Sequence, residues 1–245
     1  MLIFILGLLI GSFLNVCIYR LPKGQSIAFP PSHCTGCSNR IKPYDLIPVI
    51  SYIILKGKCR HCNTSISIKY PLVEILTGVL FLFSFLKFGY SIEFIKSIVL
   101  LSVLVAVTFI DFEYSIIQVE FMIFASLTGI VLNIIGYEFN IHLLNYLYGF
   151  LVGGGVILAI VLLTNGMGGG DIQLMTVIGL FLGFKLTLLT LMLSFVIGAF
   201  AGVTLIVLKK KSRKDFIPFG PWISIAAFVS LFFGDSILRW YFSLF

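Results

Sequence analysis

The sequence has little charge. Only 11% of its 245 residues are Asp, Glu, Lys or Arg, whereas soluble domains average roughly a quarter. Apolar residues take their place: 59% of the chain is hydrophobic and the mean hydropathy is +1.11. This composition excludes an ordinary soluble domain and predicts an integral membrane protein.

Long apolar runs recur along the chain, and a helix needs about 20 residues to cross the hydrocarbon core. The stretch 172–208 is too long for one crossing, and Gly183 and Lys185 divide it into two. The sequence therefore predicts an all-α polytopic membrane protein. Its transmembrane helices would number about eight, over 2–19, 71–87, 94–111, 119–136, 143–164, 172–184, 186–208 and 217–235.

Basic residues gather in two places. One cluster lies in the polar stretch 20–70, and the other comprises Lys209, Lys210, Lys211, Arg213 and Lys214. Basic runs can bind nucleic acid, but beside apolar spans they mark the cytoplasmic side, so we expect lipid and no nucleic acid. Six crossings separate the clusters, which places both on that side. The domains are then a first transmembrane helix (1–19), a cytoplasmic loop (20–70) and a seven-helix membrane domain (71–245).

Glycines spaced four apart occur at Gly149 and Gly153 and at Gly198 and Gly202. Such pairs let two helices approach closely. We interpret them as packing sites within the chain rather than as a dimer face, and the oligomeric state stays open.

The polar loop contains two CxxC pairs, formed by Cys34, Cys37, Cys59 and Cys62. This spacing is typical of a four-cysteine zinc site. A closed site of four thiolates leaves no position for water, so Zn2+ would be structural. A cytoplasmic location disfavours disulfides, and no thioredoxin-like pattern supports a redox role. His33 and His61 adjoin the cysteines and could replace a ligand, but we interpret them as bystanders.

Two aspartates stand at the ends of apolar runs. Asp111 ends one span and Asp171 begins another, and both fall on the cytoplasmic side of the predicted topology. Ionisable residues in membrane segments are rare and usually face a cavity. Two carboxylates at one depth could share a proton and act as general acid and base. The alternative is that Asp171 caps its helix and that Asp111 is a helix end reaching water.

Several segments together resemble type IV prepilin peptidases, which are GxGD aspartyl proteases. They are "GSFLNVCIYRLP", the paired CxxC loop, "YPLVEILTG", "IDFEYSII", "GMGGGD" and "IPFGPWISIAA", and they span nearly the whole chain. The resemblance implies Asp111 and Asp171 as the catalytic pair, with Gly168 and Gly170 in the active-site loop.

The implied activity is cleavage of the basic leader of prepilins or pilin-like proteins at the cytoplasmic face of the bacterial inner membrane. N-methylation of the new N-terminus with S-adenosylmethionine is implied as well. The sequence departs from the family pattern at Gln118, Val119 and Gln173. Glu74, just inside the second span, either serves substrate or methyl transfer or pairs structurally with a lysine or arginine of the cysteine loop, and we favour the structural role.

Two other functions remain open on the residues alone. One is a different GxGD intramembrane protease, and the other is a non-enzymatic scaffold or transporter with a zinc knuckle. In the second case the aspartates would be ion ligands or helix caps.

Overall fold

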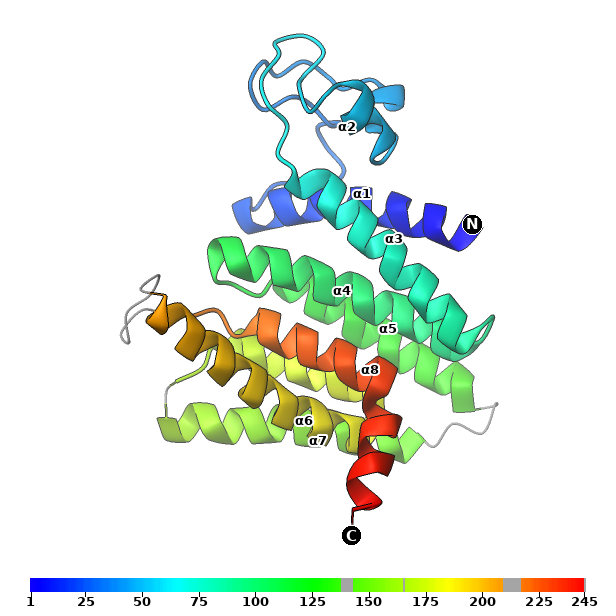
Figure 1. Cartoon of the computed structure of the whole chain (residues 1–245), viewed down its shortest axis with the longest axis vertical. Coiled ribbons are helices and arrows are strands. Elements are labelled where there is room, and N and C mark those ends of the chain that lie inside the picture. Colours follow the sequence, from blue (N-terminus) through cyan, green and yellow to red (C-terminus); the bar gives the residue numbers. More distant parts are fainter. Residues whose placement is uncertain (138–142, 165, 209–216, 245) are drawn as a thin grey trace. The chain divides into compact units, whose positions relative to one another are not determined.

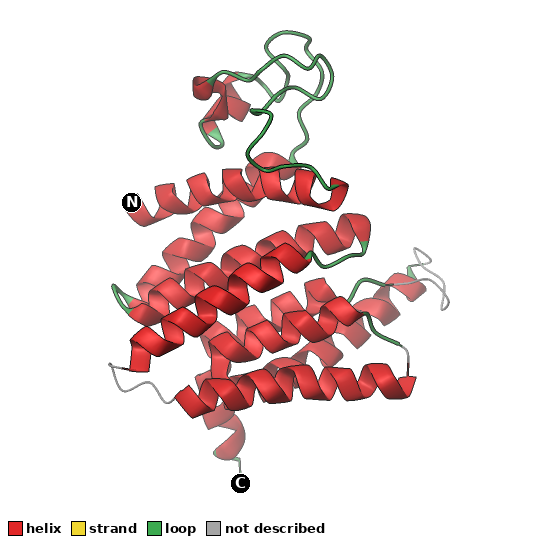
Figure 2. Ribbon diagram, turned by 180° about the vertical axis from the view of Figure 1, so that it is seen from behind, coloured by secondary structure: helices red, strands yellow, loops and turns green. Residues whose placement is uncertain are grey.

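The computed structural model describes residues 1–137, 143–164, 166–208 and 217–244, and these residues contain helices but no strand (Figures 1 and 2). Two short 3-10 turns, η1 (Leu21–Lys23) and η2 (Pro43–Leu46), precede the second helix. Seven of the described helices are long and apolar enough to cross a membrane. The α-helices are α1 (Leu2–Arg20), α2 (Ile50–Ile54), α3 (Lys69–Phe88), α4 (Ile92–Tyr114), α5 (Val119–Tyr137), α6 (Leu143–Thr164), α7 (Gly169–Val207) and α8 (Gly220–Phe242).

The chain divides into two compact units, an N-terminal unit (Met1–Phe94) and a C-terminal unit (Ile95–Phe245). In the N-terminal unit α1 packs against α3. A Cβ added to Gly7 would lie 2.7 Å from the Cα of Gly78. The two helices therefore meet backbone to backbone, which is the role of small residues between membrane helices.

In the C-terminal unit α7 packs against α6 and α8. Gly149 of α6 lies directly against the backbone of Gly179 and Gly183, and Gly153 lies against the carbonyl oxygen of Met175. The predicted use of Gly149 and Gly153 for packing within the chain is confirmed.

The longest helix, α7, is broken at Gly183. Its 39 residues would reach about 58 Å at 1.5 Å per residue, roughly twice the hydrocarbon thickness. Gly183 has φ 74° and ψ 175°, and beyond it the helix heads back toward the side from which it came (Figure 1). Phe184 donates its backbone N–H to Oδ1 of Asn145 at 3.1 Å, which satisfies a donor freed by the break. The predicted division at Gly183 is confirmed, so seven helices provide eight apolar segments.

The last helix begins later and ends later than predicted. It runs over Gly220–Phe242 rather than 217–235, because Pro221 fits the first turn of a helix and the exposed charge of Asp235 does not stop it. The second basic cluster, 209–214, lies outside the described residues.

Candidate active site and metal centre

Asp111 lies in the last turn of α4 and is only 4% exposed. The helix ends where Ser115, at φ 54°, donates its N–H to the carbonyl of Asp111 at 2.9 Å. The Asp111 side chain is held from another helix, since its Oδ2 accepts the backbone N–H of Gly220 at 2.9 Å. The amino end of α8 therefore meets the carboxyl end of α4 at this aspartate.

Asp171 is the third residue of α7 and is 5% exposed. Its Oδ2 accepts the N–H of the N-cap residue, Gly168, at 3.0 Å. This is the half of a capping box in which the third residue reaches back to the N-cap, since glycine has no side chain to make the other half. Helix capping, the alternative role for Asp171, is thus present, although Gly168 holds the N-cap position. The bond engages one oxygen of the carboxylate, so capping is compatible with acid–base chemistry.

The two aspartates lie at neighbouring helix ends, because Ile117 packs against both Gly170, the residue before Asp171, and Gly220, which binds Asp111. The structure therefore brings together the predicted pair from α4 and α7, although 60 positions separate them in the sequence. Both are buried, and both accept a hydrogen bond from the amino-terminal end of a helix, where backbone N–H groups and the helix dipole favour a carboxylate.

Ile117 lies between these helix ends. The left-handed Ser115 reverses the chain after α4, and the side chain of Ile117 then covers Gly170, where an added Cβ would lie 2.8 Å from the Cβ of Ile117. The Cδ1 of Ile117 would lie 3.5 Å from a Cβ on Gly220. Ile117 and Gly220 thus hold the pair in position. Sequence reasoning assigned neither a role, although Gly-Pro in "IPFGPW" is a helix-start signal.

The four loop cysteines come together. Their sulfur atoms all lie within 4.8 Å of one another, and Cys34 and Cys62 are 3.7 Å apart. A tetrahedral zinc ion with Zn–S bonds of about 2.3 Å needs sulfurs about 3.8 Å apart. The donor set and its spacing therefore fit a structural zinc ion.

The two CxxC turns have the same backbone design. Cys34 donates its N–H to the carbonyl of Asn39 at 2.9 Å, and Cys59 does the same to Thr64 at 2.9 Å. The residue after each pair, Ser38 or Asn63, has φ 58°. Each pair is a tight turn that points two sulfurs the same way.

The surroundings favour the metal-binding thiolate form at two of the four sulfurs. Hydrogen bonds from backbone N–H groups lower the pKa of the Cys34 thiol, whereas the pKa of the Cys37 thiol is raised to about 11. The hydroxyl and backbone of Thr64 hydrogen-bond Cys62 and lower the pKa of its thiol to about 6. His33 lies outside the sulfur cluster, with its Nδ1 3.0 Å from the carbonyl oxygen of Pro31. His61 is not among the clustered groups either.

Glu74 is buried and has structural partners. Its Oε2 accepts the backbone N–H of Val49 at 2.8 Å, and Ser12 of α1 also hydrogen-bonds it. The partner from the loop is therefore a backbone amide, not the lysine or arginine that the sequence led us to expect.

Comparisons with known proteins cover nearly the whole chain. Residues 5–88 match the bacterial peptidase A24 N-terminal domain, and residues 98–203 match the type IV leader peptidase family. The chain is 33% identical to the prepilin leader peptidase/N-methyltransferase of Bacillus subtilis (strain 168), over 98% of this chain and 96% of that protein. It is 34% identical to the protein of that name from Aeromonas hydrophila, over 98% and 92%, and 31% identical to that from Pseudomonas aeruginosa, over 97% and 91%.

The chain belongs to the type IV leader peptidase family. The resemblance found in the sequence is thereby confirmed. Asp111 and Asp171 fall inside the segment that matches the type IV leader peptidase family, and the four cysteines fall inside the N-terminal match. With seven helices able to span a bilayer, this family member is a multi-pass membrane protein. No solved structure matches the chain.

Proposed function

We propose that this protein is an aspartyl endopeptidase that removes the leader peptide from prepilins or pilin-like proteins and N-methylates the new N-terminus. The observation that carries the proposal is the buried Asp111–Asp171 pair at the junction of α4, α7 and α8. The names of its relatives give the substrate class and the second activity.

The chemistry follows from the pairing. Two interacting carboxylates titrate as a unit and can share one proton. The ionised member takes a proton from water, while the protonated member polarises the scissile carbonyl and later protonates the leaving amine. The hydrogen bonds from Gly220 and Gly168 orient one oxygen of each carboxylate, and the open space beside Gly169 leaves room near Asp171 for an extended peptide.

Methyl transfer requires a donor, which the names of the relatives imply is S-adenosylmethionine. The four clustered cysteines would hold Zn2+ and fix the fold of the loop, because four thiolates complete the coordination and exclude a catalytic water. Zinc would thus have no part in peptide cleavage.

We also propose that the protein lies in the bacterial inner membrane, with the aspartate pair and the cysteine loop at the cytoplasmic face. Lys and Arg of 20–70 support this orientation, since cytoplasmic loops carry an excess of them. The proposed domains remain the first helix (1–19), the loop (20–70) and the membrane domain (71–245).

The test is single replacement of Asp111→Asn and Asp171→Asn in cells that co-express a prepilin. We expect each variant to lose at least about 100-fold in cleavage rate, the scale of acid–base catalysis, while it still accumulates in the membrane. Asp235→Asn is the matched control, because Asp235 is an exposed acid of α8. Mass spectrometry of the precursor reports the cut and the methyl group together. Normal cleavage by either dyad variant would refute the assignment.

A further inference from the structure

The cysteine loop carries an apolar surface that the N-terminal unit does not bury. Residues 46–55, "LIPVISYIIL", form an apolar run around α2 inside an otherwise polar segment. Ile53 and Ile54 are each 67% exposed. We refer to the exposed large side chains of this run as the α2 patch, which comprises Leu46, Ile47, Ile50, Ile53 and Ile54.

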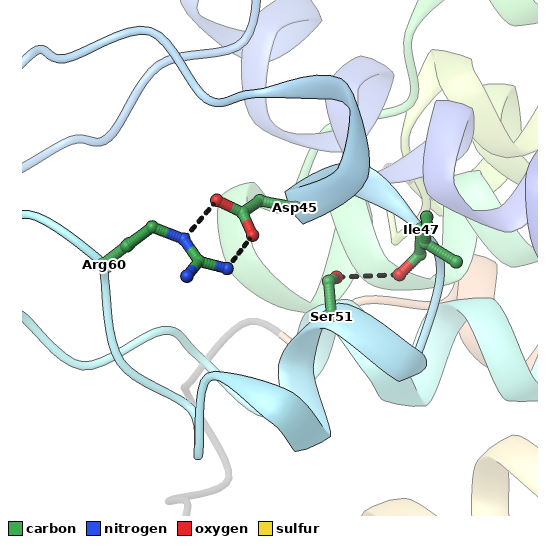
Figure 3. Close-up of polar contacts among 4 residues, drawn as sticks. All are labelled: Asp45, Ile47, Ser51 and Arg60. Carbon is green, nitrogen blue, oxygen red and sulfur yellow. Dashed lines mark hydrogen bonds and ion pairs between the residues drawn. The ribbon is translucent and has the colours of Figure 1, made fainter.

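The α2 patch is held in a defined conformation. Arg60, from the second CxxC turn, forms a bidentate ion pair with Asp45 at 2.6 and 2.9 Å, just before the patch begins (Figure 3). Within the patch, Ser51 donates its hydroxyl to the carbonyl of Ile47 at 2.7 Å (Figure 3). The isoleucines are therefore exposed by an ordered fold rather than by a loose chain.

A hydrogen bond fixes the depth of the patch relative to the membrane. Val49, the residue before α2, donates its N–H to Glu74 of α3 at 2.8 Å. Glu74 comes five residues after α3 begins at Lys69, or about 7.5 Å along the helix. The α2 patch thus lies level with the first turns of a membrane-spanning helix, whose own side chains Leu72 and Ile75 are exposed and apolar.

The surroundings of the α2 patch are strongly basic. Residues 20–70 contain eight Lys or Arg and one acid, Asp45, so this stretch carries as much net charge as the whole chain, +7. Asp45 is paired with Arg60. Lys42, Lys56 and Lys58 are exposed around the patch. Two copies of such a surface would repel one another, whereas an anionic lipid surface would attract it.

We propose that the α2 patch lies in the interface of an anionic bilayer and anchors the cysteine loop to the membrane surface. Apolar side chains flanked by lysines, held level with the end of a spanning helix, are what an interfacial segment requires. Lysines near an anionic surface add electrostatic attraction. The 20–70 segment is then a membrane-bound module rather than a free cytoplasmic loop.

The test is photocross-linking of the full-length protein in vesicles of phosphatidylglycerol and phosphatidylethanolamine. p-Benzoylphenylalanine replaces Ile53, or Leu151 as a lipid-facing control (56% exposed in α6), or Asn63 as an exposed control in the second CxxC turn. Mass spectrometry should find phospholipid adducts at positions 53 and 151 and at least several-fold fewer at 63. Lys56→Gln together with Lys58→Gln should lower the yield at 53 several-fold and leave that at 151 unchanged.

Other outcomes would overturn the proposal. Cross-linking of position 53 to a second copy, to a co-reconstituted prepilin or to another part of the same chain would identify a protein occupant. Absence of any adduct at 53, with lipid adducts at 151, would show a surface exposed to water. The unchanged yield at position 151 also serves as the check that each variant is folded and inserted.

Discussion

Three adjacent glycines before Asp171 have different surroundings, and this distinguishes their roles. Gly168 supplies the N–H that holds the carboxylate. A Cβ on Gly169 would meet nothing within 4 Å, whereas a Cβ on Gly170 would lie 2.8 Å from the Cβ of Ile117. The second glycine of the GxGD pattern therefore has a steric basis here, whereas Gly169 stands at the unconstrained position.

Gly170→Ala should displace Ile117 and, through it, the aspartate pair. We expect cleavage of a co-expressed prepilin to fall at least about 10-fold and the fold to be destabilised by about 1–3 kcal/mol, the usual cost of overpacking. Gly169→Ala is the matched control and should stay within about 2-fold of the parent, since its Cβ enters open space and alanine favours a helix. Equal effects of the two variants would contradict the conclusion that Ile117 holds the aspartate pair in position.

At the scale of elements, the paired CxxC turns are a module stabilised by a metal. Too few apolar side chains are buried around them to supply a core, so zinc would contribute most of the folding free energy of the module.

Metal analysis of the purified protein should find about one zinc per chain. Cys34→Ser or Cys59→Ser should lose it, because three thiolates and one weak ligand hold zinc poorly, and protease should then cut within 20–70. His33→Ala should keep the metal, since His33 lies outside the sulfur cluster. A metal-free protein with all four thiols reduced would refute the zinc site.

The break in α7 is a second feature at the scale of elements. Gly183 has φ 74°, and a Cβ there would overlap the side-chain amide of Asn145. Gly183→Ala should therefore destabilise the fold by about 1–3 kcal/mol from the backbone alone, because this combination of φ and ψ is essentially restricted to glycine, and should lower the thermal unfolding midpoint in detergent. Gly155→Ala in α6 is the control, because its added Cβ would meet nothing within 4 Å. No difference between the two would show that the turn tolerates a side chain.

For the whole molecule, the break decides the number of crossings. If α7 crosses twice, the chain makes eight crossings and its two ends lie on the same side. We expect alkaline phosphatase fused after Phe245 to be active, because the enzyme folds only outside the cytoplasm, and a fusion within 166–168 to be inactive. Activity at 166–168 with inactivity at the C-terminus would invert the orientation, and inactivity at both positions would mean an odd number of crossings.

Much of this organisation could be predicted from the sequence. The apolar runs gave the spans to within a few residues except in α8, because long hydrophobic stretches leave little choice of structure. The break at Gly183 and the four-cysteine cluster followed from local pattern.

What could not be predicted depends on contacts between segments distant in the chain. Gly220 meets Asp111 across 109 positions, and no local pattern specifies that encounter. The partner of Glu74 is a backbone N–H. Every residue except proline has this group, so the sequence does not indicate which residue provides it. The exposure of α2 could not be predicted for a similar reason. An apolar run is expected to be buried, and only its contacts with the rest of the fold show that it is not.

The short first segment of α7 has a consequence for the surrounding lipid. From Gly169 to the break it rises only about 21 Å, against a hydrocarbon core of about 30 Å. This hydrophobic mismatch requires the bilayer to thin beside it or one of its polar ends to be recessed below the headgroups. Asp171 stands at one of those ends. Local thinning of the bilayer would bring bulk water to this buried carboxylate. Hydrolysis of a peptide bond consumes one water molecule per turnover, so the short segment would help to supply the second reactant.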